Sequence, residues 1–343
     1  MAGSRLFPLA LLLAGLMLAA LMPAGQARAD GSYEDGWMAY ADGRHAEAAR
    51  VWTPLAEAGD ARAQNALGAL HESGRGVPAD PAAAAAWFAR AEAQDDPAGA
   101  YNLGRLHRRG IGVEKDPART LALWRKAGEA GNPAALSGLG DMALAGEGMS
   151  ADATAAADWY RKGAEAGYAP AQTALGRLLR DGRGIERDPK AAAGWLRKAA
   201  QQAFPPALVA LSGLFEKGLG VRQSLMAAHT QLAIAEMLRT GTTCFSDMYF
   251  FPEVAAREYL AAGLRAQLAF PIFDFPTAWG SGPDDYLAKG LALRDELRHE
   301  DRIRVVFGPH APYTVGEETL ARIATLAAEL DVPVHIHLHE TAA

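Results

Sequence analysis

The chain has 343 residues and a formal net charge of −6, half of its residues are hydrophobic, and it contains one cysteine. This length is enough for two domains, and the hydrophobic content is enough for a sizeable core. A single cysteine excludes a disulfide framework within the chain. The slight acidity, without a clustered basic run, argues against nucleic acid as the main partner.

Residues 1–29 have the features of a secretory signal peptide. Arg5 supplies a positive charge, the stretch from Leu6 to Leu21 is apolar, and Ala27-Arg28-Ala29 is a small-x-small cleavage site just before Asp30. A membrane anchor is the alternative, but the apolar run is shorter than the ~20 residues that a spanning helix needs. The sequence therefore predicts a periplasmic or secreted protein that has no stable membrane span after cleavage.

Three features recur at or close to every 36 residues up to Val221. They are a Leu-Gly pair, a Gly-x-Gly segment followed by an apolar residue, and a tryptophan. The Leu-Gly pairs begin at Leu67, Leu103, Leu139 and Leu175, with Leu211-Ser212 continuing the series; the Gly-x-Gly segments begin at Gly74, Gly110, Gly146, Gly182 and Gly218; the tryptophans are Trp52, Trp87, Trp124, Trp159 and Trp195. Such a period predicts stacked units that bury their apolar faces against one another.

Each unit is predicted to be a pair of helices. The Leu-Gly pair lies in the first helix, where glycine removes a side chain at a close approach of another helix. The Gly-x-Gly segment ends this helix, because glycine adopts a positive φ without steric cost. Asp-Pro steps at Asp80, Asp116 and Asp188 then begin the second helix. We expect the tryptophans of the second helices, Trp87, Trp124, Trp159 and Trp195, to occupy equivalent buried positions.

This pattern resembles the Sel-one-like repeat, a relative of the tetratricopeptide repeat, over residues 61–221. Residues 30–60 are predicted to form an N-terminal helical unit, and the repeats to extend to residue 229. The resemblance implies an α/α helical-repeat solenoid that binds a protein partner on its concave face. The scattered histidines of this region, His45, His71 and His107, are expected to be surface or structural residues without a catalytic or metal-binding role.

The 36-residue period ends after Val221, and residues 230–343 have a different pattern. Segments rich in β-branched and aromatic residues predict strands at 241–247, 265–273, 302–307 and 332–338, separated by helices near 252–263, 284–299 and 316–330. Alternating strands and helices predict parallel strands in an α/β fold. The junction between the two patterns lies within residues 222–231.

The predicted strands carry motifs that are similar to those of the amidohydrolase superfamily. The motifs are Gly241-Thr242-Thr243-Cys244-Phe245-Ser246-Asp247, Gly308-Pro309-His310-Ala311-Pro312 and His335-Ile336-His337-Leu338-His339-Glu340-Thr341. From about Thr230 onward, the sequence most resembles the methylthioadenosine and S-adenosylhomocysteine deaminases and their chlorohydrolase relatives. The resemblance implies a partial (β/α)8 barrel of about strands two to five, within a chain that is mainly α.

The family resemblance assigns roles to three residues. His337 matches a metal ligand on the fifth strand, Glu340 matches the catalytic carboxylate that moves a proton, and His310 matches a histidine that faces the substrate pocket. The implied cofactor is a divalent metal, zinc or iron, which acidifies a bound water for attack on an amino-bearing ring carbon. The other metal ligands of the family have no counterpart here, so we expect the metal not to be stably bound and the deaminase-like fragment to be inactive.

Several alternatives stay open from the sequence. His337 could form a first-strand metal pair with His335 or with His339, although the upstream motifs place this strand fifth. The chain could be a working metal-dependent hydrolase, deaminating one of these nucleosides or a related heterocycle, to which repeats were added. The two parts could also have been joined by a rearrangement or an assembly error. Cys244, alone in an apolar strand, is predicted to be a packing residue.

Overall fold

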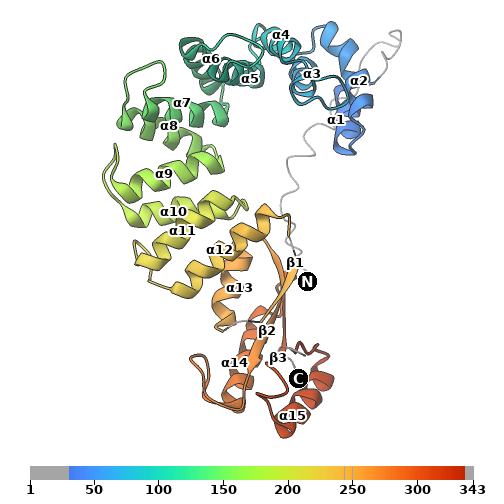
Figure 1. The fold of residues 1–343 in the computed structure, drawn as a ribbon, viewed down its shortest axis with the longest axis vertical. Coiled ribbons are helices and arrows are strands. Elements are labelled where there is room, and N and C mark those ends of the chain that lie inside the picture. Colours follow the sequence, from blue (N-terminus) through green and yellow to red (C-terminus); the bar gives the residue numbers. More distant parts are fainter. Residues whose placement is uncertain (1–30, 243, 249, 337–343) are drawn as a thin grey trace, which may run out of the picture. The chain divides into compact units, whose positions relative to one another are not determined.

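The computed structural model describes residues 31–242, 244–248 and 250–336 (Figure 1). The predicted signal peptide at residues 1–29 lies outside them. The chain divides into two compact units, one ending at Gln94 and the other beginning at Asp95. Among the described residues, no helix combines the length and apolar character that crossing a membrane requires.

The first unit contains two helix pairs. These are α1 (Tyr33–Ala41) with α2 (His45–Glu57), and α3 (Ala61–Ser73) with α4 (Pro81–Glu92). Ser32 begins α1 with a capping box: its hydroxyl accepts a hydrogen bond from the Asp35 N–H, and the Asp35 carboxylate accepts one from the Ser32 N–H. Trp52 of α2 is fully buried and donates a hydrogen bond to the Tyr33 carbonyl at 3.1 Å.

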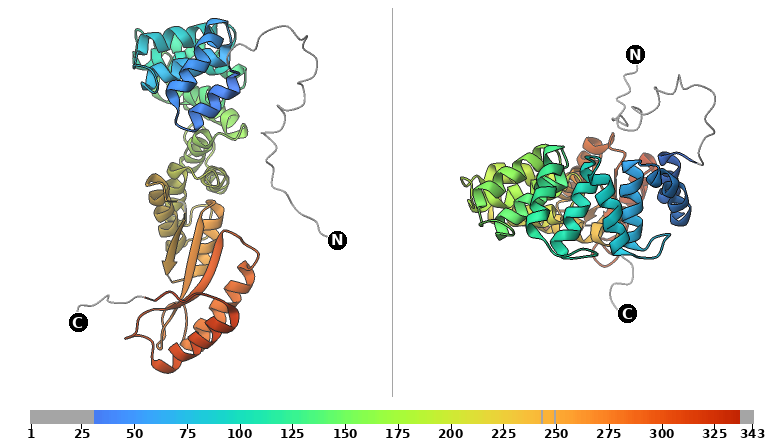
Figure 2. Two further views of the ribbon diagram at one scale, coloured as in Figure 1. Left: turned by 90° about the vertical axis from the view of Figure 1, so that its right-hand side faces the viewer. Right: turned by 90° about the horizontal axis from the view of Figure 1, so that it is seen from above.

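The second unit begins with four further helix pairs. They are α5 (Pro97–Arg109) and α6 (Pro117–Glu129), α7 (Pro133–Ala145) and α8 (Ala153–Glu165), α9 (Ala169–Asp181) and α10 (Pro189–Ala200), and α11 (Pro205–Lys217) and α12 (Leu225–Arg239). The two helices of each pair pack together, and each pair packs on the next one (Figure 2). The predicted helical-repeat architecture is therefore confirmed.

The helix boundaries lie where the repeat pattern predicts them. The first helix of each repeat ends at a glycine in the left-handed conformation, with φ from 65° to 71°, at Gly74, Gly110, Gly146, Gly182 and Gly218. The second helix begins after a side chain that accepts hydrogen bonds from free helix N–H groups, provided by Asp80, Asp116, Asp152, Asp188 and Ser224. These caps recur because the same local chemistry recurs in every repeat.

The tryptophans do not share one buried position, which corrects the prediction. The buried position of the second helix is filled by Trp52, Phe88, Trp124, Tyr160 and Leu196. Trp87, Trp159 and Trp195 lie one residue earlier and are only half-buried. A cation three residues further along covers each of these rings, from Arg90, Lys162 and Lys198 respectively. One residue is a rotation of about 100° around a helix, so the two positions face different surroundings.

The buried side chain of each repeat packs on the glycine of its Leu-Gly pair. A Cβ atom at Gly104 would lie 2.6 Å from the Trp124 ring, and one at Gly140 would lie 2.6 Å from the Tyr160 ring. Gly68 packs in the same way on Phe88, and Gly176 on Leu196. The prediction that this glycine permits a close approach of helices is therefore confirmed.

The predicted α/β segment follows the last helix pair. Strands β1 (Cys244–Met248), β2 (Arg265–Ile272) and β3 (Ile303–Pro309) form a parallel sheet in the order β1-β2-β3. In the register, Phe245 pairs with Ala266, which pairs with Ile303. Helices α13 (Pro252–Ala261), α14 (Pro283–Leu297) and α15 (Glu317–Leu330) alternate with the strands. This arrangement is consistent with the predicted partial barrel.

The predicted fourth strand of the segment, at 332–338, is described only up to residue 336. Val334 forms an isolated parallel bridge with Phe307. The Phe307 N–H donates to the Pro333 carbonyl at 3.2 Å, and the His335 N–H donates to the Phe307 carbonyl at 2.8 Å. This part of the chain therefore lies beside β3, on the side away from β2.

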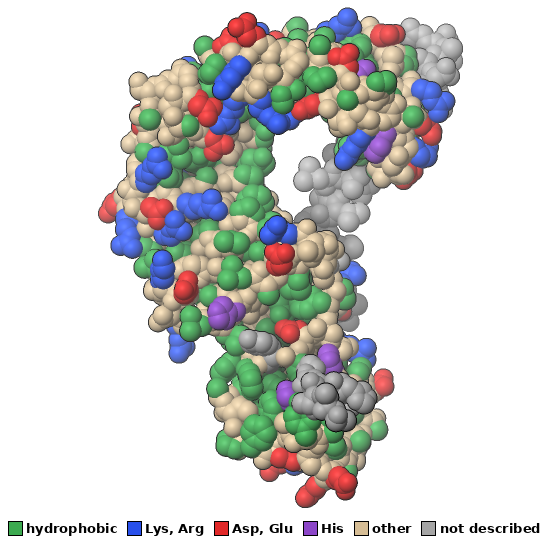
Figure 3. Space-filling model, viewed as in Figure 1, with side chains coloured by type: hydrophobic (Ala, Val, Ile, Leu, Met, Phe, Trp, Pro, Cys, Tyr) green, Lys and Arg blue, Asp and Glu red, His purple; other side chains and the backbone are tan. Residues whose placement is uncertain are grey.

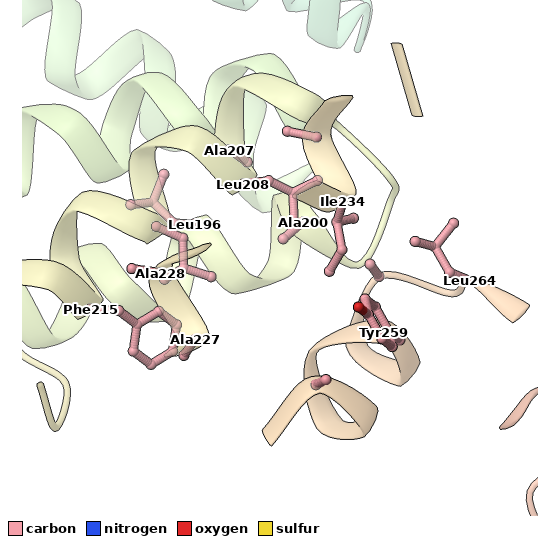
Figure 4. Close-up of a cluster of buried hydrophobic side chains, with 14 of the residues drawn as sticks. Leu196, Ala200, Ala207, Leu208, Phe215, Ala227, Ala228, Ile234, Tyr259 and Leu264 are labelled. Atoms are coloured by element: carbon pink, nitrogen blue, oxygen red, sulfur yellow. The ribbon is translucent and has the colours of Figure 1, made fainter. Parts of the chain in front are cut away.

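Helix α12 connects the repeats to the α/β segment. It packs on α11 through fully buried Ile234 and on α13, where the Gln231 side-chain amide donates a hydrogen bond to the Glu258 carboxylate. Figure 4 shows Phe215 and Ile234 in the same buried cluster as Tyr259 of α13. The core of the repeats thus continues into the α/β segment, and the predicted boundary after residue 229 falls inside a continuous helix.

Candidate functional site

His310 directly follows β3 and lies at the carboxyl edge of the parallel sheet, the edge at which α/β proteins bind ligands. Its ring stacks on Phe273, which follows β2, with 4.8 Å between centroids. Its backbone N–H donates to the Ile272 carbonyl at 3.1 Å. The structure therefore places His310 where a ligand-facing residue belongs, and its role in substrate binding stays a prediction.

The side chain of Thr314 fixes the orientation of His310. The Thr314 hydroxyl donates to the Ala311 carbonyl at 2.9 Å and lies 3.2 Å from the His310 Nδ1. Because a hydroxyl has only one proton to donate, the hydrogen bond with His310 requires a proton on Nδ1. In the neutral ring, this leaves Nε2 as the acceptor nitrogen.

Aromatic rings surround His310 at this edge of the sheet. Phe250, two residues after β1, stacks on Phe273 at 5.8 Å, and Phe275 meets the same ring at 5.1 Å. The Tyr313 ring lies edge-on to His310 at 6.3 Å and is 60% exposed. Flat apolar faces beside a hydrogen-bonding imidazole are suited to holding a planar heterocycle.

The predicted metal ligand His337 and the predicted proton carrier Glu340 lie outside the described residues, as does His339. His335, the first histidine of the same motif, is described. Its Nδ1 lies 3.0 Å from the hydroxyl of Ser246 in β1, and that hydroxyl also accepts a hydrogen bond from the Gln267 Nε2 at 3.2 Å. His335 therefore shares one face of the sheet with Ser246 and Gln267.

The described residues do not provide a site for a divalent metal. A catalytic zinc site takes three protein ligands and keeps an open position for water. Within residues 31–242, 244–248 and 250–336, no three His, Cys, Asp or Glu side chains lie close enough together to hold a metal ion. Because the predicted ligand His337 lies outside these residues, the implied metal stays a prediction, and no chemical step is derived through it.

Cys244 is exposed, which corrects the prediction that it packs inside the segment. Side chains alternate between the two faces of a strand. In β1, Phe245 meets the Tyr259 ring edge-to-face at 4.8 Å, and the Asp247 carboxylate accepts a hydrogen bond from the Tyr259 hydroxyl at 2.6 Å. These contacts direct Phe245 and Asp247 toward α13, so Cys244 lies on the opposite face.

A second candidate site is a groove in the repeats of the second unit. It has a volume of about 390 Å³ and is lined by α5, α7, the start of α9 and residues from α6 and the neighbouring loops. Small residues of α7, including Ser137 and Gly138, line it beside Trp124; a Cβ atom at Gly138 would lie 2.4 Å from the Trp124 ring. Lys and Arg side chains gather over α5 and α6 in the space-filling view (Figure 3).

Two polar pairs hold the acidic residues of this groove. Arg108 and Glu147 form a bidentate ion pair with N–O distances of 2.7 and 3.0 Å, and these hydrogen bonds raise the pKa of Arg108 and lower the pKa of Glu147. The Asp141 carboxylate accepts a hydrogen bond from the Tyr160 hydroxyl at 2.7 Å. Burial, together with this hydrogen bond, raises the pKa of Tyr160. Both carboxylates of the groove are therefore engaged within the protein.

Sequence reasoning missed the groove because it compared only what the repeats share. The position of Arg108 is occupied by Glu72, Leu144 and Arg180 in other units, so the residue has no periodic signal. Its partner Glu147 lies 39 residues away and reaches it only through the stacking of two units. The signal that could have found the groove is a set of charged and aromatic residues that occurs in one unit and is not repeated in the others.

These observations define a tetratricopeptide-like helical-repeat protein joined to a parallel α/β segment. In comparisons with known families, the Sel1 repeat matches residues 61–96, 97–132, 133–168 and 169–204, and the amidohydrolase family matches residues 187–343. Residues 61–204 are therefore Sel1 repeats, and the C-terminal third contains an amidohydrolase domain with deaminase homologues. The resemblance seen in the sequence is confirmed for both parts.

Curated deaminases match the C-terminal third of the chain. The 5-methylthioadenosine/S-adenosylhomocysteine deaminase of Saccharophagus degradans is 66% identical over 113 residues, which cover 33% of this chain and 25% of the relative. The enzyme of the same name from Teredinibacter turnerae is 62% identical over 111 residues, covering 32% of this chain and 25% of the relative. The chain thus spans about a quarter of the length of these relatives.

Solved structures resemble the repeats. A Sel1 repeat protein from Oxalobacter formigenes superimposes with a TM-score of 0.55 at 27% identity, covering 60% of this chain and 85% of that protein. The protective antigen c5321 from uropathogenic Escherichia coli gives a TM-score of 0.53 at 24% identity, covering 87% of this chain and 61% of that one. The second likeness supports the fold alone.

Proposed function

We propose that this protein is an exported scaffold for protein–protein interaction, and that the groove on α5, α7 and α9 binds a segment of its partner. Sel1 repeats generally mediate interactions between proteins. The groove is the observation that carries the proposal, because it combines small residues, aromatic rings and charged side chains in one hollow. Such a mixture provides close backbone approach, apolar contact and specific polar pairing together.

A photo-crosslinking experiment tests the scaffold function. A photoreactive residue is placed at Ala134, which lines the groove, and in a matched protein at Arg125, an exposed residue of α6 outside the groove lining. Irradiation in cells is expected to give a discrete crosslinked product from position 134 and none from position 125. Equal crosslinking from both positions, or from neither, would contradict a partner site in the groove.

Deamination of methylthioadenosine or S-adenosylhomocysteine is the second candidate function, and the 66% identity to a deaminase favours it. Against it, the residues that precede β1 in this chain are repeat helices. We therefore give the α/β segment a structural role, in which it covers the apolar end of the last repeat pair. Solenoid ends need such a cover, and Ile234, Tyr259 and Leu264 bury apolar surface at this end (Figure 4).

Export of the protein is part of the proposal. Arg5, the apolar stretch from Leu6 to Leu21 and the small residues Ala27 and Ala29 support it. N-terminal sequencing of protein recovered from the periplasm or the medium is expected to begin at Asp30. Recovery from the cytoplasm of a chain that still begins at Met1 would contradict export and leave the groove proposal unaffected.

A further inference from the structure

We infer that the groove is selective for an acidic partner: an extended peptide whose carboxylates pair with Arg109 and Lys115. This inference rests on the scaffold function proposed above and names the chemistry of the partner at the same site. It follows from three properties of the groove, which are the charges left uncompensated, their spacing and the shape of the surface beside them.

The first property is an uncompensated positive charge at the rim. The groove lining contains the acidic residues Asp141 and Glu147, and both are engaged, by Tyr160 and Arg108 respectively. Arg109 and Lys115 are exposed, and no carboxylate of the described residues is paired with either within ion-pair distance; the charge of Lys115 adds to the hydrogen bond from Arg108 in lowering the pKa of Glu147. The charges available to a ligand are therefore cationic, and a carboxylate ligand would pair with them.

The second property is the proximity of these two cations. Arg109 is the last residue of α5, and Gly110 follows it in the left-handed conformation. A Cβ atom at Gly110 would lie 3.2 Å from the Lys115 Cβ, so the loop returns the Lys115 stem to the end of α5. Arg109 and Lys115 thus leave the backbone close together and can contact neighbouring acidic side chains of one peptide.

The third property is a surface that suits an extended chain. Half-buried Ala134 of α7 has a short side chain, which lets a peptide backbone approach, whereas Ser137 and Gly138 are buried and the Trp124 ring fills the space at Gly138. Tyr101, whose ring stacks on Trp124, and Tyr168 are half-buried in the lining and add aromatic surface for apolar side chains. A groove of about 390 Å³ is within the range of ligand pockets. It admits a chain segment rather than a folded domain.

The test is a binding titration of the full chain followed by fluorescence anisotropy. The probe is a short fluorescein-labelled peptide in which Glu alternates with Ala around one Tyr; its analogues carry Gln or Lys in place of Glu. We expect the Glu peptide to bind at least about tenfold more tightly than the Gln peptide, and more weakly as salt is added. Binding of the Gln peptide as tight as that of the Glu peptide would overturn the inference.

Two charge-reversal variants locate the site. The double variant Arg109→Glu, Lys115→Glu is expected to bind the Glu peptide about tenfold or more weakly than the parent. The matched control, Arg119→Glu with Arg125→Glu, changes the same charge on exposed positions of α6 outside the groove lining and is expected to bind as the parent does. Equal weakening in both variants would show a general charge effect and overturn the inference.

Two further results distinguish this inference from the scaffold function. A labelled oligothymidylate that binds as tightly as the Glu peptide would show unselective anion binding and would overturn an acidic peptide as the partner. Crosslinking at position 134 without binding of the Glu peptide would leave the scaffold function standing and remove the acidic partner. If neither crosslinking in the groove nor binding of the Glu peptide is observed, the scaffold function and the acidic partner are both contradicted.

Discussion

Gly184 lies directly against the carbonyl group of Ala153: a Cβ atom on Gly184 would be 2.2 Å from both the carbonyl carbon and the carbonyl oxygen. Ala153 is the first residue of α8, and Gly184 is the second glycine of the Gly-x-Gly segment after α9. Gly220 meets Pro189 in the same way. At Gly184 and Gly220, the second glycine of the segment thus seats the loop of one repeat on the second helix of the repeat before it.

Gly184→Ala is therefore expected to destabilise the protein. The substitution places a Cβ inside the contact with Ala153 and strains a φ of 71°, and together these effects cost about 2–4 kcal/mol. Gly167→Ala is the control, because Gly167 has a φ of 86° but no atom within 4 Å of the added Cβ. For Gly167→Ala, urea unfolding should show a loss of only about 1 kcal/mol in the free energy of unfolding. Equal losses would mean that the contact between repeats contributes nothing.

The two tryptophan positions of the second helices predict unequal effects of truncation. Trp124→Ala removes a ring that is 3% exposed and packs on Gly138, and it should cost about 3–5 kcal/mol. Trp159→Ala removes a half-buried ring that lies 4.6 Å from the Lys162 ammonium, and it should cost roughly 1–2 kcal/mol. Chemical unfolding of both variants measures the difference. If Trp159→Ala proved as costly as Trp124→Ala, the description of two distinct positions would be wrong.

Glu258 predicts a dependence of stability on pH at the junction of α12 and α13. Burial is the main influence and raises the pKa of Glu258, while the hydrogen bond from Gln231 and the charges of Arg197 and Arg257 lower it less. A raised pKa in the folded state favours the protonated carboxyl. The contribution of protonated Glu258 to the free energy of unfolding is therefore complete below the ordinary Glu pKa of 4.5. This contribution is lost as the pH rises through the folded-state pKa of Glu258.

Glu258→Gln tests this dependence. The amide keeps a polar partner for Gln231 without a buried charge, so the variant should be more stable than the parent at neutral pH, by about 1 kcal/mol. It should also lose the decline in the free energy of unfolding above pH 4.5. Glu236→Gln, at an exposed carboxylate of α12, should change neither quantity. A parent whose stability rises over this pH range would contradict the assigned sign.

Much of the repeat fold could be predicted because its determinants are local. A glycine at the end of α9 needs no distant residue to favour a positive φ, and Asp188 caps α10 from the adjacent position. The buried position was missed because it depends on which helix face meets the next unit. The spacings of 35 and 37 residues on either side of Trp87 already indicated a second helix position, which Phe88 and Tyr160 then fill with other rings.

The candidate sites were less accessible from sequence because they depend on contacts between distant residues. The motif around His310 was recognised, but its stacking on Phe273 follows from the pairing of β2 with β3. The apolar neighbours of Cys244 predict an interior position, whereas the orientation of β1 is set by the contact of Phe245 with Tyr259, which leaves Cys244 exposed. A strand pattern alone does not tell which of its two faces is covered.

The last prediction is that the 343-residue chain does not deaminate methylthioadenosine or S-adenosylhomocysteine. A catalytic site of this kind needs at least three protein ligands for its metal. The family resemblance assigns one ligand, His337, and one proton carrier, Glu340, and the residues before β1 form the helix pair α11 and α12. A single imidazole holds a divalent ion without fixed geometry, so the bound water is neither reliably acidified nor oriented, and Glu340 has no activated water to deprotonate.

Incubating the purified chain with each nucleoside, with zinc, iron or manganese added, and following ammonia release measures this activity directly. No metal-dependent release is expected, because the loss of even single members of a catalytic unit lowers turnover by orders of magnitude. The full-length 5-methylthioadenosine/S-adenosylhomocysteine deaminase of Saccharophagus degradans serves as the positive control. Turnover that disappears in both His337→Ala and Glu340→Gln would contradict the prediction. It would mean that further ligands come from a second chain or from residues of this chain that the resemblance does not assign, because neither residue can act without a completed metal site.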